Sequence, residues 1–258
     1  MPGSRFTDIR HLETVDSTNR YLLDEARAGA PEGVVALAEH QSAGRGRLGR
    51  RWEAPAGANL LLSVLLRPIL PAGERHLVSA VVALAAADAV QLELGVTLSV
   101  KWPNDLLAPD GRKVAGVLAE ADVVGNPGVA PPIVVGIGLN VNWPVVDSDL
   151  PAELVGTATS LCQLVGRPVN RLVLVDSLLR ALEPRVEALA SPVGRRGQAA
   201  DLRDRCSTIG AQVGIELDGE HLIGTATDVT RQGHLQVDVG GAIRTVVAGD
   251  VVHLRFRS

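Results

Sequence analysis

The stretch HQSAGRGRLGRRW, residues 40–52, decides between two fold classes. Its glycines at 44, 46 and 49 have the spacing of a dinucleotide-binding fingerprint and follow an apolar run, 33–40, that predicts a strand. That fingerprint also needs a helix beginning at the glycines and an acid about twenty residues later. The following RRWEAPAGAN (50–59) lacks helical periodicity, and LSVLLRPIL (62–70) contains no acid. The sequence therefore excludes a dinucleotide-binding fold.

The same loop has a different physical meaning. Alternating glycine and arginine gives exposed backbone N–H groups and several guanidinium forks, which suit an anionic ligand. Such a loop is costly to order unless a ligand offsets the lost entropy. We expect an anion-binding lid, mobile when empty. A solvated basic loop or a nucleic-acid contact stays open as an alternative at this point.

Composition restricts the class of protein. The 258 residues are 46% hydrophobic and 21% charged, which is typical of a globular chain. A net charge of −4 disfavours DNA and membrane-surface binding. Two distant cysteines predict neither a disulfide scaffold nor a zinc site. No secretory signal is visible, and the longest apolar run, 77–87, is too short to span a bilayer, so we expect a cytoplasmic protein.

Periodicity predicts two parts of unequal size. Strands are expected at 9–16, 33–40, 59–67, 97–102, 113–124 and 132–143, and helices at 17–28, 76–94 and 170–189, the last kinked or broken at Pro184. After residue 206 the pattern changes to short alternating strands, the last over 243–256, which predict a small β-barrel. We therefore predict an α+β protein with a mixed α/β domain at 1–205 and a β domain at 206–258. The loop between 124 and 132 receives no predicted role.

Six motifs occur in order along the chain: STN (17–19), Q-x-x-GRGRLGR-x-W (41–52), KWPND (101–105), KVAGVLAE (113–120), GIGLN (136–140) and TSL (159–161). Together they closely resemble the bacterial biotin protein ligases, of the monofunctional type without an N-terminal helix-turn-helix. The resemblance implies a mixed-sheet, class II synthetase-like catalytic domain followed by an SH3-like β domain. It also implies biotin and MgATP as substrates, biotinyl-5′-AMP as intermediate, and a biotin carboxyl carrier domain as partner.

Lysine usage is consistent with that chemistry. Lys101 and Lys113 are the two lysines of the chain, and its other 23 basic residues are arginines. We interpret the two lysines as positions where a compact ammonium fits and a wide guanidinium does not. The resemblance makes Lys113 the cation between the biotin carboxylate and the α-phosphate, with Arg47 beside it. Asp105 is implied to bind or deprotonate the carrier lysine. A surface lysine and an ordinary turn aspartate are the alternatives.

The resemblance also implies two groups of binding residues. Hydroxyls and amides suit a neutral ureido ring, although Ser17 and Thr18 equally suit a helix cap. The implied biotin-binding residues are Ser17, Thr18, Asn19, Gln41, Gly44, Arg45, Gly46, Arg47, Lys113 and Gly116. The implied ATP-binding residues are Arg47, Arg50, Trp52, Lys101, Asn104, Lys113 and Asn140.

Alternatives remain for two residues of the loop and for the function of the chain. Trp52 is expected to stack on adenine or to act as an apolar latch for the loop, and Arg51 is equally well explained as a solvated charge. A lipoate-type ligase of the same fold and a non-catalytic anion or nucleic-acid binder are the rival functions. The sequence does not identify the metal ligands or the oligomeric state.

Overall fold

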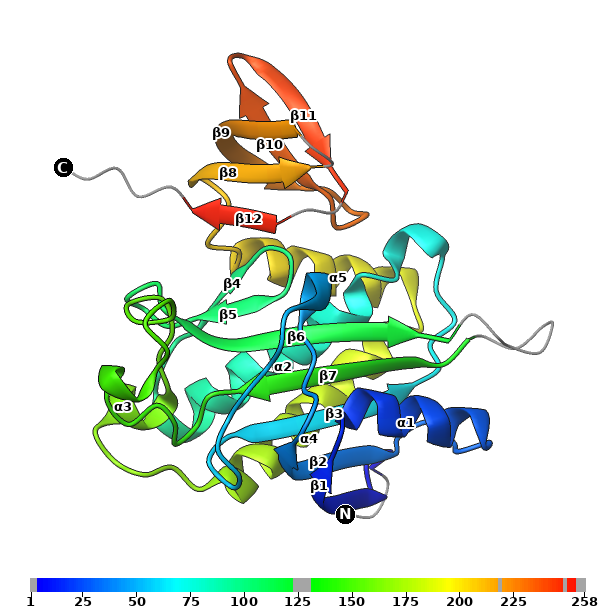
Figure 1. Ribbon diagram of the computed structural model, residues 1–258. Coiled ribbons are helices and arrows are strands. Elements are labelled where there is room, and N and C mark those ends of the chain that lie inside the picture. Colours follow the sequence, from blue (N-terminus) through cyan, green and yellow to red (C-terminus); the bar gives the residue numbers. More distant parts are fainter. Residues whose placement is uncertain (1–3, 123–130, 218–219, 248–249, 254–258) are drawn as a thin grey trace.

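A seven-stranded mixed sheet forms the larger part of the computed structural model, which describes residues 4–122, 131–217, 220–247 and 250–253 (Figure 1). The strand order is β1-β2-β3-β7-β6-β5-β4. Only β1 and β2 pair in parallel, and the other neighbours are antiparallel. The strands are β1 (Ile9–Val15), β2 (Val35–Gln41), β3 (Leu60–Leu66), β4 (Ser99–Lys101), β5 (Asp105–Leu107), β6 (Lys113–Ala121) and β7 (Ile133–Leu139). The predicted mixed sheet is confirmed.

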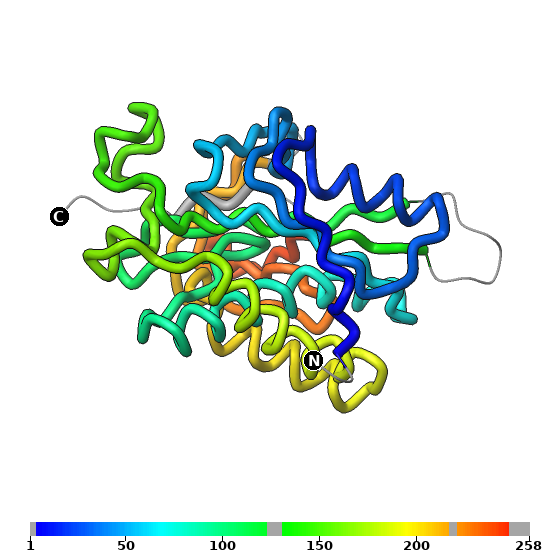
Figure 2. Tube along the Cα trace, turned by 90° about the horizontal axis from the view of Figure 1, so that it is seen from below, coloured from blue at the N-terminus to red at the C-terminus, as the bar shows by residue number. Residues whose placement is uncertain are grey.

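Helices cover both faces of this sheet, as Figure 2 shows. All seven residues of β3 are buried, because α2 (Leu77–Leu94) and α4 (Arg171–Ala188) cover one face and α1 (Thr18–Arg27) covers the other. Alternation along β3 places Leu62 and Val64 in the main core and Leu65 against α1. The same alternation turns Ser63 toward the start of α1, where its hydroxyl contacts Thr18 and Asn19.

The central helix α2 is apolar around most of its surface because it is buried from Leu77 to Val90, except at Ser79 and Asp88, and only its last turn is exposed. The segment Ala72–Leu94 is long and apolar enough to cross a membrane, but 67% of its most apolar window is buried inside the protein. A short 3₁₀ turn, η2 (Ala72–Glu74), precedes helix α2, and Gly95 ends the helix at a φ of 68°. The observed role is that of a core helix.

Two expectations about the helices are corrected. Helix α4 continues through Pro184 and does not break there, because Leu182 and Val186 on either side are both held in the core, which outweighs the lost hydrogen bond and the crowding at the proline. Helix α5 (Pro192–Asp204) was not predicted, since among its residues Leu202 alone is buried. Its start is defined instead by Ser191, whose Oγ accepts from the Gly194 N–H.

The second, smaller sheet is antiparallel, with strand order β11-β10-β9-β8-β12. Its strands are β8 (Gln212–Leu217), β9 (Glu220–Val229), β10 (Leu235–Val239), β11 (Ala242–Val246) and β12 (Asp250–His253). The predicted β module is thus confirmed, but the single strand expected over 243–256 is wrong. Strands β11 and β12 lie at opposite edges of the sheet. The division of the chain at residues 205 and 206 stays a prediction, and most of the 124–132 loop lies outside the described residues.

Candidate active site

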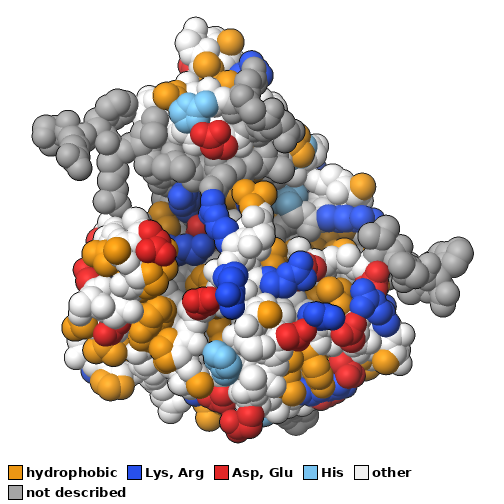
Figure 3. Space-filling model, viewed as in Figure 1, with side chains coloured by type: hydrophobic (Ala, Val, Ile, Leu, Met, Phe, Trp, Pro, Cys, Tyr) orange, Lys and Arg blue, Asp and Glu red, His pale blue; other side chains and the backbone are white. Residues whose placement is uncertain are grey.

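A cavity of about 940 Å³ lies beside the large sheet, between the Arg-Gly loop (residues 44–52), the turn at 101–105 and the segment 150–158. Lys and Arg side chains gather across this face, below the small sheet (Figure 3). With the exception of Gly44, every predicted site residue lines the cavity: Ser17, Thr18, Asn19, Gln41, Arg45, Gly46, Arg47, Arg50, Trp52, Lys101, Asn104, Asp105, Lys113, Gly116 and Asn140. Residues from five separate motifs are therefore brought to one place.

One end of the cavity is lined by neutral polar groups. Ser17 is the N-cap of α1, but its side chain makes no capping hydrogen bond. The Thr18 backbone N–H donates to Gln41 Oε1 over 2.8 Å, and Ser63 Oγ lies 2.7 Å from both Thr18 Oγ1 and Asn19 Oδ1. Because an amide oxygen only accepts, the Ser63 hydroxyl donates to Asn19. This network presents the hydroxyls and amides that a neutral, urea-like group requires.

Two of the cations that line the cavity are held by the KWPND turn. Lys113 Nζ lies 2.7 Å from Asp105 Oδ1 and 5.7 Å from the centre of the Trp52 ring. Arg47 donates to Asn104 Oδ1 over 3.2 Å, and Asn104 Nδ2 donates to Val117 O over 2.7 Å. Asp105 and Asn104 of this turn therefore each fix the side chain of one cation in the cavity wall.

The Arg-Gly loop is folded as a hairpin over the cavity. Residues 45 and 51 form an antiparallel bridge, and η1 (Arg47–Gly49) makes the tip. The Trp52 N–H donates to Gly44 O over 3.0 Å. A Cβ at position 44 would lie 2.3 Å from the Trp52 carbonyl oxygen. Gly44 is therefore required for this backbone approach, which is a role the sequence pattern did not distinguish from ligand contact.

Two glycines form the surface on which Trp52 rests. A Cβ at Gly138 would lie 2.4 Å from Trp52 Cε2, and one at Gly116 would lie 3.3 Å from Trp52 Cζ3. The indole Nε1 is buried and has no hydrogen-bond partner among the described residues. GIGLN and KVAGVLAE thus contribute flat backbone against which the loop's aromatic ring packs.

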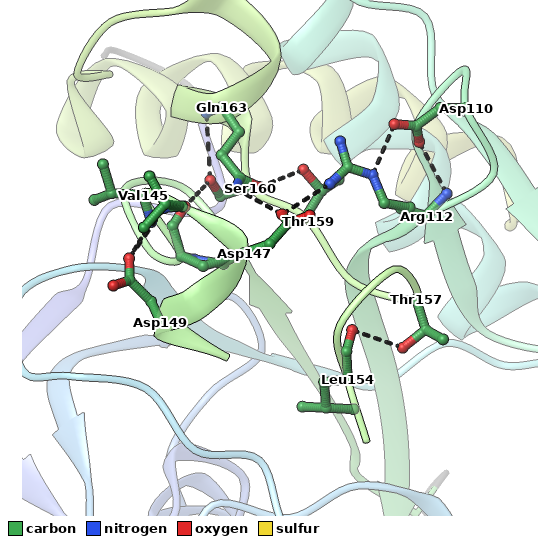
Figure 4. Close-up of polar contacts among 12 residues, drawn as sticks. Asp110, Arg112, Val145, Asp147, Asp149, Leu154, Thr157, Thr159, Ser160 and Gln163 are labelled. Carbon is green, nitrogen blue, oxygen red and sulfur yellow. Dashed lines mark hydrogen bonds and ion pairs between the residues drawn. The ribbon is translucent and has the colours of Figure 1, made fainter. Parts of the chain in front are cut away.

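A second polar cluster supports the wall of the cavity at 144–163 (Figure 4). Arg112 donates to Asp110 over 2.7 Å and to Asp147 over 3.2 Å, and Asp147 also accepts from Gln163. Burial acts to raise the pKa of Asp110, but the hydrogen bonds from Arg112 outweigh it and hold that pKa below its ordinary value. Through Asp147, the cluster connects η3 (Asp147–Asp149) with Gln163 of α3 (Leu161–Val165).

The TSL motif is part of this wall. Ser160 caps α3, and the Thr159 carbonyl accepts from Asn140 Nδ2 over 3.0 Å. Asn140 Oδ1 accepts from Asn59, a fully buried residue for which the sequence analysis predicted no role. Most of the hydrogen-bonding capacity of Asn140 is therefore used by the protein, although its side chain borders the cavity.

The sequence analysis did not predict the position of Trp102. Its side chain is 5% exposed and packs in the hydrophobic cluster of the small sheet, with Val213 and Val237. Its backbone N–H donates to Thr208 Oγ1 over 2.9 Å, and its Nε1 donates to Gly233 O over 2.8 Å. The KWPND turn is thus anchored in the second module, and an aromatic residue beside a polar turn was the sequence signal for this.

The metal chemistry of the site is limited. The part of the chain that the structure describes contains no group of three His, Cys, Asp or Glu side chains suited to a metal ion. Mg²⁺ bound to a nucleotide needs one or two protein oxygens, because phosphates and water supply the rest. Asp105 and Asn104 provide oxygens of this kind, which is compatible with a metal that arrives with its nucleotide.

Comparisons with known proteins show which family the chain resembles in sequence and in fold. The chain is 40% identical to the biotin–[acetyl-CoA-carboxylase] ligase of Mycobacterium tuberculosis, over 98% of this chain and 91% of that relative. It is 32% identical to the bifunctional ligase/repressor BirA of Escherichia coli, over 93% and 72%. Its fold is similar to that of the Aquifex aeolicus biotin protein ligase in complex with biotin and ATP, with a TM-score of 0.80 at 24% identity, covering 97% and 100%.

The fold is α+β, and the relatives at 40% and 32% identity place the chain among protein ligases. The model of the biotin/lipoate A/B protein ligase family matches residues 12–140. The chain belongs to this family, as its motifs led us to expect.

Proposed function

We propose that this chain is an ATP-dependent biotin ligase that acts on a carrier protein. Biotin's carboxylate attacks the α-phosphorus of MgATP, and pyrophosphate leaves. A lysine amine of the carrier then attacks the carbonyl of biotinyl-5′-AMP, and AMP leaves. The 40% identity to a biotin–[acetyl-CoA-carboxylase] ligase supports a carboxylase carrier as acceptor. The finer assignments, to a biotin carboxyl carrier domain and to the cytoplasm, are parts of the proposal.

The observation that carries the proposal is the place of Lys113. Its ammonium belongs to the same cavity as Ser17, Gln41 and the Arg-Gly loop, and Asp105 holds it at 2.7 Å. Two anions must meet in the first step, and a preorganised cation between them is worth ~2.7–4 kcal/mol of barrier by analogy with oxyanion donors. We assign Lys113 and Arg47 to that stabilisation.

Biotin occupies the neutral end in this proposal. Ser17, Thr18 and Gln41 face the ureido ring, and Arg45 and Gly46 close over it. Asn19 lines the same pocket, but its Nδ2 already donates to Leu118 O and to Glu120 Oε2. Both amide hydrogens of Asn19 are therefore used within the protein, so its contribution to biotin is shape and an acceptor oxygen.

The nucleotide occupies the opposite side, toward the small sheet. Lys101 and Arg50 are assigned to the triphosphate, and Asn104 and Asn140 to the nucleotide. Trp52, whose indole N–H is buried without a partner among the described residues, is assigned to the adenine. The loop also keeps water from the mixed anhydride, which protects it from hydrolysis.

Asp105 serves the second step. Its carboxylate orients Lys113 in the structure and lies at the reaction centre, where it can accept a proton from the incoming amine. Asp105→Asn should slow transfer to the carrier more than adenylate formation, because the amide keeps the hydrogen-bond geometry but not the basicity.

The test is biotin-dependent exchange of pyrophosphate into ATP. Lys113→Arg keeps the charge but replaces a compact ammonium by a wide fork, and Lys113→Ala removes the charge. We expect both to lose exchange by roughly 10²–10³-fold. Exchange with lipoate in place of biotin would transfer the assignment to a lipoate ligase, which the comparisons do not favour. Salt-dependent oligonucleotide binding without exchange would support the anion-binding alternative.

A further inference from the structure

Glu120, near the end of β6, connects two parts of the site that are distant in sequence. Its Oε1 lies 3.0 Å from Arg45 NH1, in the Arg-Gly loop. Its Oε2 accepts from Asn19 Nδ2 over 2.9 Å, at the amide-lined end. The residue closes the KVAGVLAE motif, and neither the proposed reaction nor the predicted site includes it. One carboxylate thus contacts both the loop and the pocket beneath it.

On the pocket side the contact fixes an amide. Asn19 is 4% exposed, and its side chain is held at both ends. Ser63 donates to Oδ1 over 2.7 Å, while Nδ2 donates to Leu118 O over 3.1 Å and to Glu120. A rotation of the amide by half a turn would exchange its oxygen and its NH₂ group, and the oxygen would then face two acceptors. Glu120 therefore helps to determine which edge of Asn19 faces the pocket.

On the loop side the contact fixes a position. The Arg45 side chain is 56% exposed and that of Glu120 is 20% exposed, so the ion pair adds little to overall stability. Residue 45 is joined by its backbone to residue 51, so the ion pair acts on both arms of the hairpin. A small free energy is sufficient to change the balance between an open and a closed loop.

We propose that Glu120 is a positioning residue that couples closure of the Arg-Gly loop to the ordering of the biotin end through Arg45 and Asn19. This inference rests on the proposed function for the identity of the ligand. It assigns no chemical step to Glu120. Its consequence is that the loop closes best over a pocket whose Asn19 is already oriented, which retains the adenylate until the carrier arrives.

Glu120→Gln separates the two contacts. The amide has one oxygen where the carboxylate has two, so it serves Asn19 or Arg45 but not both. Asn19 is buried, whereas Arg45 has water available, so the oxygen should turn to Asn19 and the NH₂ group should face the guanidinium. The variant should therefore loosen the loop while leaving the KM for biotin within about twofold, since Asn19 keeps its acceptor.

Two further variants complete the comparison. Glu120→Ala removes the acceptor as well, so the KM for biotin should rise about five- to tenfold, the effect of one unpaired buried donor. Glu53→Gln is the matched control, because Glu53 follows the loop directly and pairs with Arg51 in it, but its side chain is 69% exposed. It should behave like the wild type in every assay.

The experiment combines two measurements on the full chain. The first is the rate of trypsin cleavage after the loop arginines without ligand, followed by mass spectrometry. The second is the half-life of biotinyl-5′-AMP retained after one turnover without carrier. Glu120→Gln should speed both cleavage and adenylate loss by about two- to fivefold, as expected for loss of one half-exposed ion pair.

Equal cleavage and retention in Glu120→Gln, Glu53→Gln and wild type would overturn the inference. So would an unchanged KM for biotin in Glu120→Ala. The cleavage assay needs no substrate, so it tests the loop contact even if the wild type forms no adenylate. Absence of adenylate in the wild type would instead refute the proposed function.

Discussion

Trp102 provides the strongest test of how the two modules cooperate. The ring is almost fully buried in the cluster of the small sheet, yet the residue belongs to the turn that presents Asn104 and Asp105. Replacing a buried aromatic residue by alanine typically costs ~3–5 kcal/mol, from lost contacts and a cavity. We expect Trp102→Ala to lower the free energy of unfolding by about that amount.

Trp102→Phe makes the same test with less disturbance. It keeps most of the ring but loses the hydrogen bond from Nε1 to Gly233 O, which leaves a half-buried carbonyl without that donor. The expected cost is ~1 kcal/mol, near the lower end for an unpaired group. The backbone bond to Thr208 is retained, so the turn should keep its path.

The assay is urea unfolding followed by circular dichroism, combined with the KM for ATP and for biotin. Because the anchored turn belongs to the nucleotide side, Trp102→Ala should raise the KM for ATP about tenfold, which corresponds to ~1.4 kcal/mol. The KM for biotin should change much less. Ile243→Ala, at an exposed position on β11, is the control and should stay within ~0.5 kcal/mol of wild type.

Two results would refute this reasoning. A loss of stability below about 1 kcal/mol in Trp102→Ala would mean that the ring does not hold the modules together. Equal changes in the KM for ATP and for biotin would mean that the anchor does not act on the nucleotide side.

Three further predictions concern single positions. Gly138→Ala places a methyl group 2.4 Å from Trp52 Cε2, so it should displace the ring and lower the free energy of unfolding by ~1–3 kcal/mol. The displaced ring should also speed trypsin cleavage of the loop, and unchanged cleavage would contradict the packing. Burial lowers the pKa of His76 to about 4, so the unfolded chain binds the proton more readily than the folded chain does. The free energy of unfolding should therefore fall by ~3 kcal/mol as the pH drops from about 6.5 to 4, and His76→Phe should remove that part of an acid-unfolding curve. Gly95→Ala meets no neighbouring atom but forces a φ of 68° on alanine, so thermal unfolding should show a loss of ~1–2 kcal/mol, whereas no loss would mean that the helix end rearranges.

Sequence reasoning located the site because the chemistry depends on residue types at close spacing. Lys101 and Lys113 were notable in a chain that otherwise uses arginine, and the Arg-Gly stretch failed as a dinucleotide fingerprint, which left an anion-binding lid as the prediction. Continuous apolar runs also predicted α2 and β3, since an element that is buried on most sides contains few polar residues. These features follow from short segments whose meaning does not depend on what packs against them.

Other features depended on partners that only the fold supplies. Helix α5 buries a single leucine, so its pattern is weak, and α4 tolerates Pro184 because the core holds both sides of it. The end of β6 showed no function until α1 and the Arg-Gly loop were brought to Glu120.

The sequence by itself determined the family, the cationic loop and the residues that meet at the cavity, because those are statements about chemical type and local order. Only the tertiary structure decided which hydrogen-bond donors and acceptors of those residues are used within the protein and which remain for a ligand. Asn19 has both amide hydrogens committed to β6, and Trp102, which borders the cavity, packs in the core of the second module. Hydrogen-bond satisfaction and burial are properties of pairs of groups distant along the chain, and the fold is what brings those pairs together.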